Sequence, residues 1–138
     1  MPLNRRGEPG DLEEVGAIQR SSPGAALWPV ADYLEHDFRV AVEDGHVVGF
    51  LVARRVSPDE AELLNIAVAP EFRRKHVARD LLGTLLADTR GTLFLEVRES
   101  NTAARKLYKS IGFQEVSIRR DYYENPPETA IVMKFHSC

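Results

Sequence analysis

Residues 65–78, with the sequence NIAVAPEFRRKHVA, decide how this chain is expected to fold. An apolar strand stops at Pro70, a cluster of basic residues follows, and apolar residues then recur at helical spacing from Val77 onward. Such a strand, turn and helix point successive backbone N–H groups and the positive end of the helix dipole at one spot. The stretch therefore predicts an anion-binding turn, and the alternative is an exposed basic first turn of a surface helix.

Apolar spacing on both sides of this stretch predicts the other elements. We expect helices over residues 12–18, 28–36, 77–86 and 101–111. We expect strands over residues 38–42, 47–53, 62–69, 92–97, 113–121 and 130–136. A tight turn is expected at Asp44-Gly45 and a left-handed helix end at Gly112. The element order, which begins with a strand before the first helix, is β, α, α, β, β, β, α, β, α, β, β. It predicts an α/β (α+β) fold in which a central mixed, mostly antiparallel sheet of about seven strands carries helices on both faces.

The bulk composition is that of an ordinary globular protein. At 138 residues, of which 43% are hydrophobic and 28% charged, the chain fits a single domain over residues 1–138. It has no apolar run near the ~20 residues that a membrane span needs, so no membrane partner is expected. The chain opens on polar residues and its only cysteine is Cys138. We therefore expect a reducing, cytoplasmic setting.

The charged and metal-ligating residues narrow the choice of partners. A net charge of −3 argues against a nucleic-acid partner, which needs a basic face, and suits a cationic substrate better. The histidines are expected to bind no metal because they show no ligand spacing with one another; they are His36, His46, His76 and His136.

The basic turn resembles the coenzyme A pyrophosphate loop of the GCN5-related N-acetyltransferases (GNAT). That loop reads Gln or Arg, two residues, Gly, one residue, then Gly or Ala; Arg73 and Ala78 match it, and His76 stands at the first glycine. An imidazole at this position could crowd the phosphate, or it could rotate outward, become protonated and donate a hydrogen bond to the phosphate. The alternative without a function, a solvated surface histidine, is compatible with either arrangement. The resemblance implies contacts between acetyl-CoA and Ile66, Ala67, Val68, Arg73, Arg74, Lys75, His76, Val77, Ala78, Arg79 and Asn101.

A second group of motifs narrows the resemblance. Residues 95–101, LEVRESN, together with Gly112-Phe113 and residues 119–123, RRDYY, are similar to the bacterial branch of this family that acetylates the N-terminal alanine of a ribosomal protein. The similarity runs from about Leu63 to Met133. It implies the GNAT fold and an acetyl-CoA-dependent N-acyltransferase with acetyl-CoA as co-substrate. It also implies a peptide or protein N-terminus, such as that of a ribosomal protein, as the acceptor.

Two residues carry the proton transfers that the resemblance implies. Glu96 lies in an otherwise apolar strand, where a charge is costly unless it is paired, for instance with Arg98, or used. The resemblance makes it the general base that takes a proton from the acceptor ammonium. Tyr108 fits a core aromatic, and the resemblance makes it the acid that protonates the departing coenzyme A thiolate. A backbone N–H near Val68 is implied to stabilise the oxyanion of the tetrahedral intermediate.

Three further residues have both a structural and a functional interpretation. Asn101 suits a helix N-cap, and in the family it also contacts the cofactor. Tyr122 and Tyr123 are either ordinary cross-strand packing or the side chains that hold the backbone of an entering peptide. The resemblance implies that the amine attacks directly, without an acyl-enzyme. Cys138 is also unsuited to be a nucleophile.

Three hypotheses for function follow from these residues. The first is an N-terminal protein acetyltransferase. The second is a small-molecule amine acetyltransferase, which the loosely matching segment 21–38 with its Trp28-Pro29 pair keeps open. The third is a cofactor-binding module without turnover, motivated by His76. The sequence leaves the acceptor amine, the role of segment 21–38 and the oligomeric state open.

Overall fold

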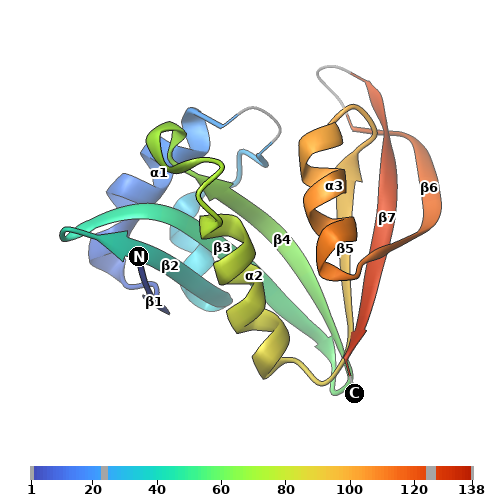
Figure 1. The fold of residues 1–138 in the computed structure, drawn as a ribbon, viewed down its shortest axis with the longest axis horizontal. Helices are drawn as coiled ribbons and strands as arrows, with labels where there is room; N and C mark the ends of the chain where they lie inside the picture. The colour runs from blue at the N-terminus through green and yellow to red at the C-terminus, as the bar shows by residue number, and fades with distance from the viewer. Residues whose placement is uncertain (1, 23–24, 124–126, 138) are drawn as a thin grey trace. The chain divides into compact units, whose positions relative to one another are not determined.

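The computed structural model describes residues 2–22, 25–123 and 127–137, and these form two compact units. The first unit comprises Met1–Arg54 and Leu63–Asp88, and the second comprises Arg55–Glu62 and Thr89–Cys138. The elements in chain order (Figure 1) are β1 Leu3–Arg6, η1 Pro9–Asp11, α1 Leu12–Arg20, η2 Val30–Glu35, β2 Asp37–Glu43, β3 His46–Ser57, β4 Glu60–Val68, η3 Pro70–Phe72, α2 Val77–Asp88, β5 Gly91–Arg98, α3 Thr102–Ile111, β6 Gln114–Tyr123 and β7 Glu128–Ser137.

The strands form a seven-stranded sheet with the hydrogen-bonded order β1-β2-β3-β4-β5-β7-β6. β4 and β5 pair in parallel, whereas β1 with β2, β2 with β3, β5 with β7 and β6 with β7 pair antiparallel. The expected mixed, mostly antiparallel sheet and the order of its elements are therefore confirmed. The assignment of a single domain stays a prediction.

In the first unit, one sheet face is covered by α1 and η2. Val15 of α1 and Tyr33 of η2 are fully buried in one apolar cluster with Phe38 and Phe50 of the sheet. The Tyr33 ring centroid lies 5.9 Å from that of Phe38 and 5.8 Å from that of Phe50. The helix predicted after Asp11 is therefore buried on the face that carries its apolar residues.

The opposite face of the same unit is covered by α2 (Figure 1). At Gly49 in β3, a β-carbon would come within 3.0 Å of Val77 and 3.5 Å of Leu81. Residues 47–53 of β3 are all buried, as expected of a strand with helices over both faces. The prediction of helices on both faces is confirmed in this unit.

The turn at Asp44-Gly45 joins β2 and β3 as predicted. Both residues have positive φ, 52° and 77°, which is the backbone of a two-residue hairpin turn that follows the natural twist of the strands.

Two expectations of the local structure were wrong in detail. The predicted helix over 28–36 is the short 3₁₀ helix η2, with Pro29 at its N-cap and Tyr33 turned into the core. The strand expected to end at Ala53 continues to Ser57, because residues 54–57 extend the ladder as a mostly exposed strand before β4 begins at Glu60. The sequence did not indicate this extension, because polar residues such as Arg54 and Arg55 interrupt the apolar pattern on which the strand was predicted.

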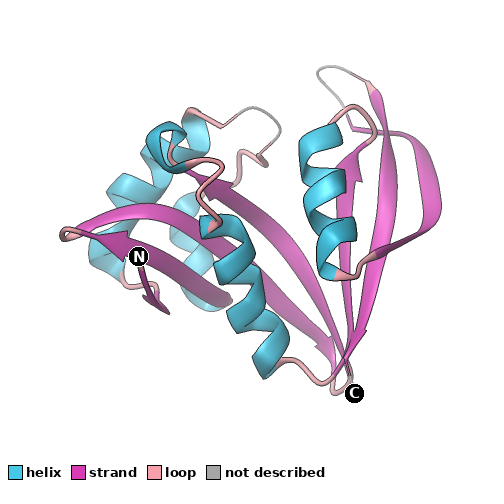
Figure 2. Cartoon of the chain, in the orientation of Figure 1, coloured by secondary structure: helices cyan, strands magenta, loops and turns pink. Residues whose placement is uncertain are grey.

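The second unit contains the antiparallel strands β5, β7 and β6 with α3 (Figure 2). Alternate residues of β5 are buried: Leu93, Leu95 and Val97. The Asn101 side chain accepts a hydrogen bond from the N–H of Ala104 at 3.2 Å and caps α3 as predicted. Gly112 ends this helix with φ 125°, a conformation that favours glycine.

Some expectations fall on residues that the structure does not describe. Cys138 lies outside the described residues, as do residues 23 and 24 of segment 21–38. Within the described ranges, no helix is both long enough and apolar enough to cross a membrane.

Candidate active site

The predicted anion site lies in the first unit, where the chain leaves η3 and enters α2. Arg74, Lys75 and His76 are exposed, and Val77 is buried at the start of the helix. Arg74 and His76 both have left-handed backbones, with φ of 63° and 64°. Glycine adopts this region freely, whereas other residues enter it at a cost of about 1–2 kcal/mol. The loop therefore has a glycine-type backbone at His76 even though the residue there is a histidine.

Arg73 is engaged with the protein itself. Its Nε donates to the carbonyl oxygen of Val68 at 3.1 Å, and one terminal nitrogen donates to the carbonyl oxygen of Ser21 at 3.2 Å and to Ser22 Oγ at 3.3 Å. The side chain thus ties the end of α1 to the end of β4. Arg74, Lys75 and Arg79 are the other exposed cations at this turn, beside the N–H groups of the first turn of α2, and Lys75 Nζ lies 5.3 Å from the Phe72 ring centroid.

The strand that leads into this turn carries a polar network that the sequence pattern did not single out. Ala67 and Val68 are buried and Ile66 is half-buried, but Asn65 beside them is also buried, at 6% exposure. Its Oδ1 accepts the N–H of Ile66 at 3.0 Å and the N–H of Ala26 at 3.3 Å. A buried amide in an apolar strand needs such partners, and this rule is the signal that could have identified it.

The amide nitrogen of Asn65 completes the network. It donates to the Ala26 carbonyl at 3.0 Å, to the Tyr33 hydroxyl at 3.1 Å and to Gln19 Oε1 at 3.2 Å. The Tyr33 hydroxyl also donates to Gln19 Oε1, and Gln19 Nε2 donates to the Trp28 carbonyl at 2.8 Å. Burial raises the pKa of Tyr33. The backbone is therefore fixed to β4 at Ala26 and to α1 at Trp28, although it has no regular structure.

In the second unit, Glu96 on β5 is held by Arg119 through one carboxylate oxygen. Arg119 of β6 donates to Glu96 Oε1 at 2.8 Å, and the Glu96 side chain is 18% exposed. Oε2 is buried and has no hydrogen-bond partner among the described residues. Arg98, the partner considered from the sequence, instead lies 3.5 Å from Glu128. Within the described part of the chain, Oε2 is therefore available as an acceptor.

Tyr122 and Tyr123 lie next to this carboxylate at the end of β6. Their rings meet edge to face with centroids 5.2 Å apart, the Arg119 guanidinium lies 4.9 Å from the Tyr122 centroid, and the Arg98 guanidinium lies 4.3 Å from the Tyr123 centroid. Burial first, and the negative charge of Glu96 second, raise the pKa of Tyr123 to about 12 and raise that of Tyr122 as well. Both hydroxyls are therefore protonated at neutral pH.

Tyr108 is buried on α3, at 6% exposure, with its ring centroid 5.7 Å from that of Phe113. Burial raises its pKa well above the usual value, and the proximity of Tyr123 adds to this shift. Phe113 in turn contacts Phe135, which pairs with Leu93 of β5. This aromatic cluster lies on the Leu93 face of the strand, and Glu96 points to the other face because side chains alternate along a strand.

The structure thus brings Glu96, Tyr122 and Tyr123 together in the second unit, and Tyr123 lies near enough to Tyr108 to raise the pKa of Tyr108. The predicted cofactor residues 66–68 and 73–79 lie in the first unit. Asn101 lies in the second unit, where its side chain caps the N-terminus of α3.

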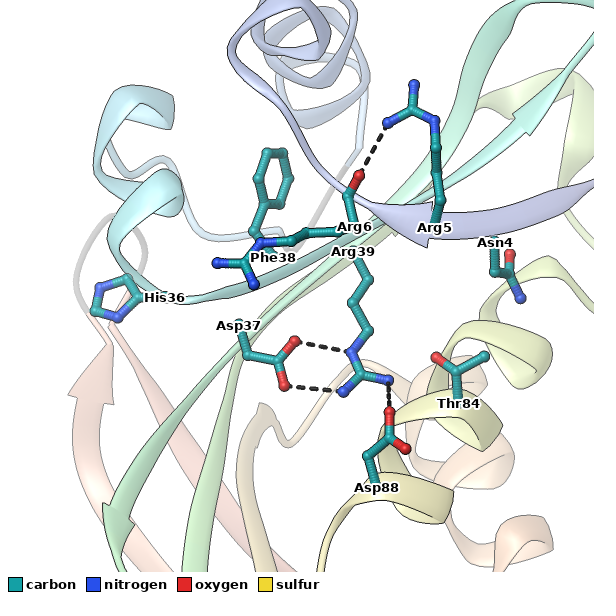
Figure 3. Close-up of a pocket in the computed structure, with 9 residues that line it drawn as sticks. All are labelled: Asn4, Arg5, Arg6, His36, Asp37, Phe38, Arg39, Thr84 and Asp88. Carbon is teal, nitrogen blue, oxygen red and sulfur yellow. Dashed lines mark hydrogen bonds and ion pairs between the residues drawn. The ribbon is translucent and has the colours of Figure 1, made fainter.

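A pocket of about 660 Å³ in the first unit lies away from these residues, between β1, β2 and the end of α2 (Figure 3). Its central cation, Arg39, donates from Nε to Asp37 at 2.8 Å and from a terminal nitrogen to Asp88 at 2.9 Å. Two carboxylates therefore already neutralise it, and none of the residues predicted for the site lines the pocket.

Comparison with known proteins defines the class. Residues 13–113 match the model of the acetyltransferase (GNAT) family, and the chain belongs to this family. The predicted resemblance is thereby confirmed, and the class of protein is an acetyltransferase.

Individual relatives are more specific. The [ribosomal protein bS18]-alanine N-acetyltransferase of Haemophilus ducreyi is 41% identical over 101 residues, which cover 68% of this chain and 69% of that protein. The protein of the same description from Salmonella typhimurium is 48% identical over 96 residues, covering 65% and 64%. The matched part thus spans about two thirds of the length of these relatives.

Solved structures extend the similarity over the whole fold. The crystal structure of the ribosomal-protein-S18-alanine N-acetyltransferase from Escherichia coli has a TM-score of 0.85 and 32% identity, covering 100% of this chain and 96% of that one. Ard1 from Thermoplasma volcanium has a TM-score of 0.91 and 29% identity, with coverage of 99% and 98%.

Proposed function

We propose that this chain transfers the acetyl group of acetyl-CoA to the N-terminal α-amine of a protein, with the alanine N-terminus of ribosomal protein bS18 as its acceptor. The names of the bacterial relatives and the match to the Escherichia coli structure support the acceptor. The observation that carries the chemistry is the buried Oε2 of Glu96, which has no partner among the described residues. A free acceptor atom beside two protonated tyrosines suits the removal of a proton from an ammonium group.

The first step is deprotonation of the acceptor. An α-ammonium group must lose a proton before its nitrogen can attack a thioester, and a carboxylate in reach, directly or through one water, can accept that proton. Glu96 is the proposed base. The neighbouring hydroxyls of Tyr122 and Tyr123 are proposed to hold the backbone of the entering peptide.

The second step is departure of the thiolate. Tyr108 is proposed to donate its hydroxyl hydrogen to the departing sulfur, and its raised pKa keeps that hydrogen in place at neutral pH. Glu96 and the aromatic cluster of Tyr108 lie on opposite faces of β5. Glu96 would therefore accept the proton of the amine on one side of the strand, and Tyr108 would protonate the thiolate from the other. The amine attacks the acetyl carbon directly, without an acyl-enzyme.

The co-substrate is proposed to bind through the first unit. The left-handed backbone at Arg74 and His76, with Lys75 and the first turn of α2, fits a pyrophosphate. Ile66 to Val68 are proposed to pair with the pantetheine arm, with an N–H near Val68 facing the oxyanion. Asn101 is proposed as a further contact through its amide nitrogen.

The test is a screen for coenzyme A release from acetyl-CoA. The acceptors are a peptide that begins with alanine, the same peptide with a blocked N-terminus, peptides with other first residues, polyamines and free amino acids. The proposal expects release with the free alanine peptide and none with the blocked one. Release with polyamines or amino acids alone would establish the small-molecule hypothesis instead. If the protein binds acetyl-CoA but no acceptor leads to release of coenzyme A, the hypothesis of a cofactor-binding module without turnover would be supported.

A further inference from the structure

We infer that Arg119 is a positioning residue of this reaction: it holds Glu96 Oε1, so that Oε2 is presented to the acceptor amine, and it holds the Tyr122 ring at the side of the acceptor. This inference rests on the proposed function, because it gives Arg119 a role only if Glu96 accepts the proton. The sequence assigns no role to Arg119 beyond its place in the RRDYY motif.

The register of the sheet places Arg119 for this contact. Glu96 is paired with Val132 of β7, and Arg119 of β6 is paired with Ala130, two residues along the same face of β7. Paired residues project to the same face of a sheet, so both side chains lie on one face with β7 between them. The Arg119 side chain crosses the buried Ala130 to reach Glu96 at 2.8 Å.

Arg119 makes two contacts at once, and together they define a geometry. Its guanidinium donates to Glu96 Oε1 and lies 4.9 Å from the Tyr122 centroid. A planar guanidinium fixed by a carboxylate and an aromatic ring holds both partners in one orientation. The carboxylate bound at Oε1 therefore presents Oε2, the buried atom that has no partner among the described residues.

The exposure of the pair favours positioning over stability. The Arg119 side chain is 55% exposed, and ion pairs open to solvent contribute little to the free energy of unfolding. Arg98 does not substitute for it, because Arg98 lies over Tyr123 and is paired with Glu128. The charged and titratable groups around the cluster of Glu96 and the tyrosines are Arg119, Tyr122 and Tyr123 of β6, Arg98 of β5, Glu128 of β7 and Glu62 of β4.

The test compares Arg119→Met with Arg120→Met, the same change at the next, exposed residue of β6. Arg119→Met keeps the aliphatic stem and loses the charge. We expect kcat to fall about 10- to 100-fold, as for a misplaced catalytic group. Arg119→Lys should recover part of kcat, and Arg120→Met should match the wild-type protein.

A double variant separates positioning from folding. If Arg119 acts through Glu96, the variant with both Glu96→Gln and Arg119→Met is no slower than Glu96→Gln alone. An additive loss in the double variant would overturn the inference. An Arg119→Met protein with the kcat of Arg120→Met would also overturn the inference. In that case, a low turnover of Glu96→Gln would leave the proposed function standing. If Glu96→Gln keeps full turnover, both the proposed base and the inference fail.

Discussion

Removal of the Asn65 side chain should loosen the segment around Ala26 and cost a large share of the stability. In Asn65→Ala, the N–H groups of Ile66 and Ala26 lose the acceptor that they reach at 3.0 and 3.3 Å, and the Ala26 carbonyl loses a donor at 3.0 Å. Each buried polar group left without a partner lowers the free energy of unfolding by about 1–3 kcal/mol. Gln19 and Tyr33 are not counted, because they keep the hydrogen bond between them. Because these backbone groups are partly buried, we expect a total of about 2–4 kcal/mol.

Thermal and urea unfolding measure this loss. For a domain of this size, about 2–4 kcal/mol corresponds to a fall in Tm of roughly 6–20 °C. Tyr33→Phe, which removes one hydroxyl from the network, should cost about 1 kcal/mol. The matched control is Asn4→Ala on the edge strand β1, where the loss should stay within about 0.5 kcal/mol. If Asn65→Ala unfolds with the midpoint of Asn4→Ala, the network does not anchor the segment and the reasoning is refuted.

Three further predictions follow from single contacts. His76→Gly should raise stability by about 1 kcal/mol in thermal unfolding, because it relieves a φ of 64°; a lower Tm would mean that the imidazole makes a contact worth more than the strain. Tyr108→Phe should lower turnover about 10²-fold while Tm stays near the wild-type value, since the ring that packs on Phe113 is retained; undiminished turnover would exclude it as the acid. Hydrogen bonds from Arg5 lower the pKa of Asp11 below 3.8, so its contribution to stability is complete above that pH and is lost as the pH falls through the folded value. Asp11→Asn should therefore flatten the pH dependence of unfolding below about pH 4, and an unchanged acid profile would show that other carboxyls dominate it.

Regular elements were predictable because their signals are local. The helix of Val77 and Leu81 and the alternation of Leu93, Leu95 and Val97 follow from spacing alone, and both were found. The bounds of β1, by contrast, have no apolar alternation to mark them, because the strand has one exposed leucine and two arginines. Its pairing with β2 defines it as a strand. The 3₁₀ helix η2 likewise depends on distant contacts, since Tyr33 is held by Gln19 and Asn65.

The residue types of the candidate site were predictable, but their partners were not. Arg98 was the structural alternative for the partner of Glu96 in the sequence, whereas the sheet register brings Arg119 to Glu96 from two strands away and Arg98 to Glu128. Arg73 was expected to face an anion. It bonds instead to Val68, five residues away, and to Ser21 and Ser22 at the end of α1, which are 52 and 51 residues away in sequence. Such pairings depend on topology, which spacing along a single element does not encode.

The central claim is that the acceptor is the α-amine of a polypeptide. The most direct measurement is mass-spectrometric mapping of the product formed from acetyl-CoA and a peptide that carries both an N-terminal alanine and an internal lysine. We predict one acetyl group on the α-amine and none on the lysine, and a rate at the α-amine about 10²- to 10⁴-fold lower with Glu96→Gln protein. Acetylation of the lysine side chain, or of neither amine by wild-type protein that binds acetyl-CoA, would contradict it.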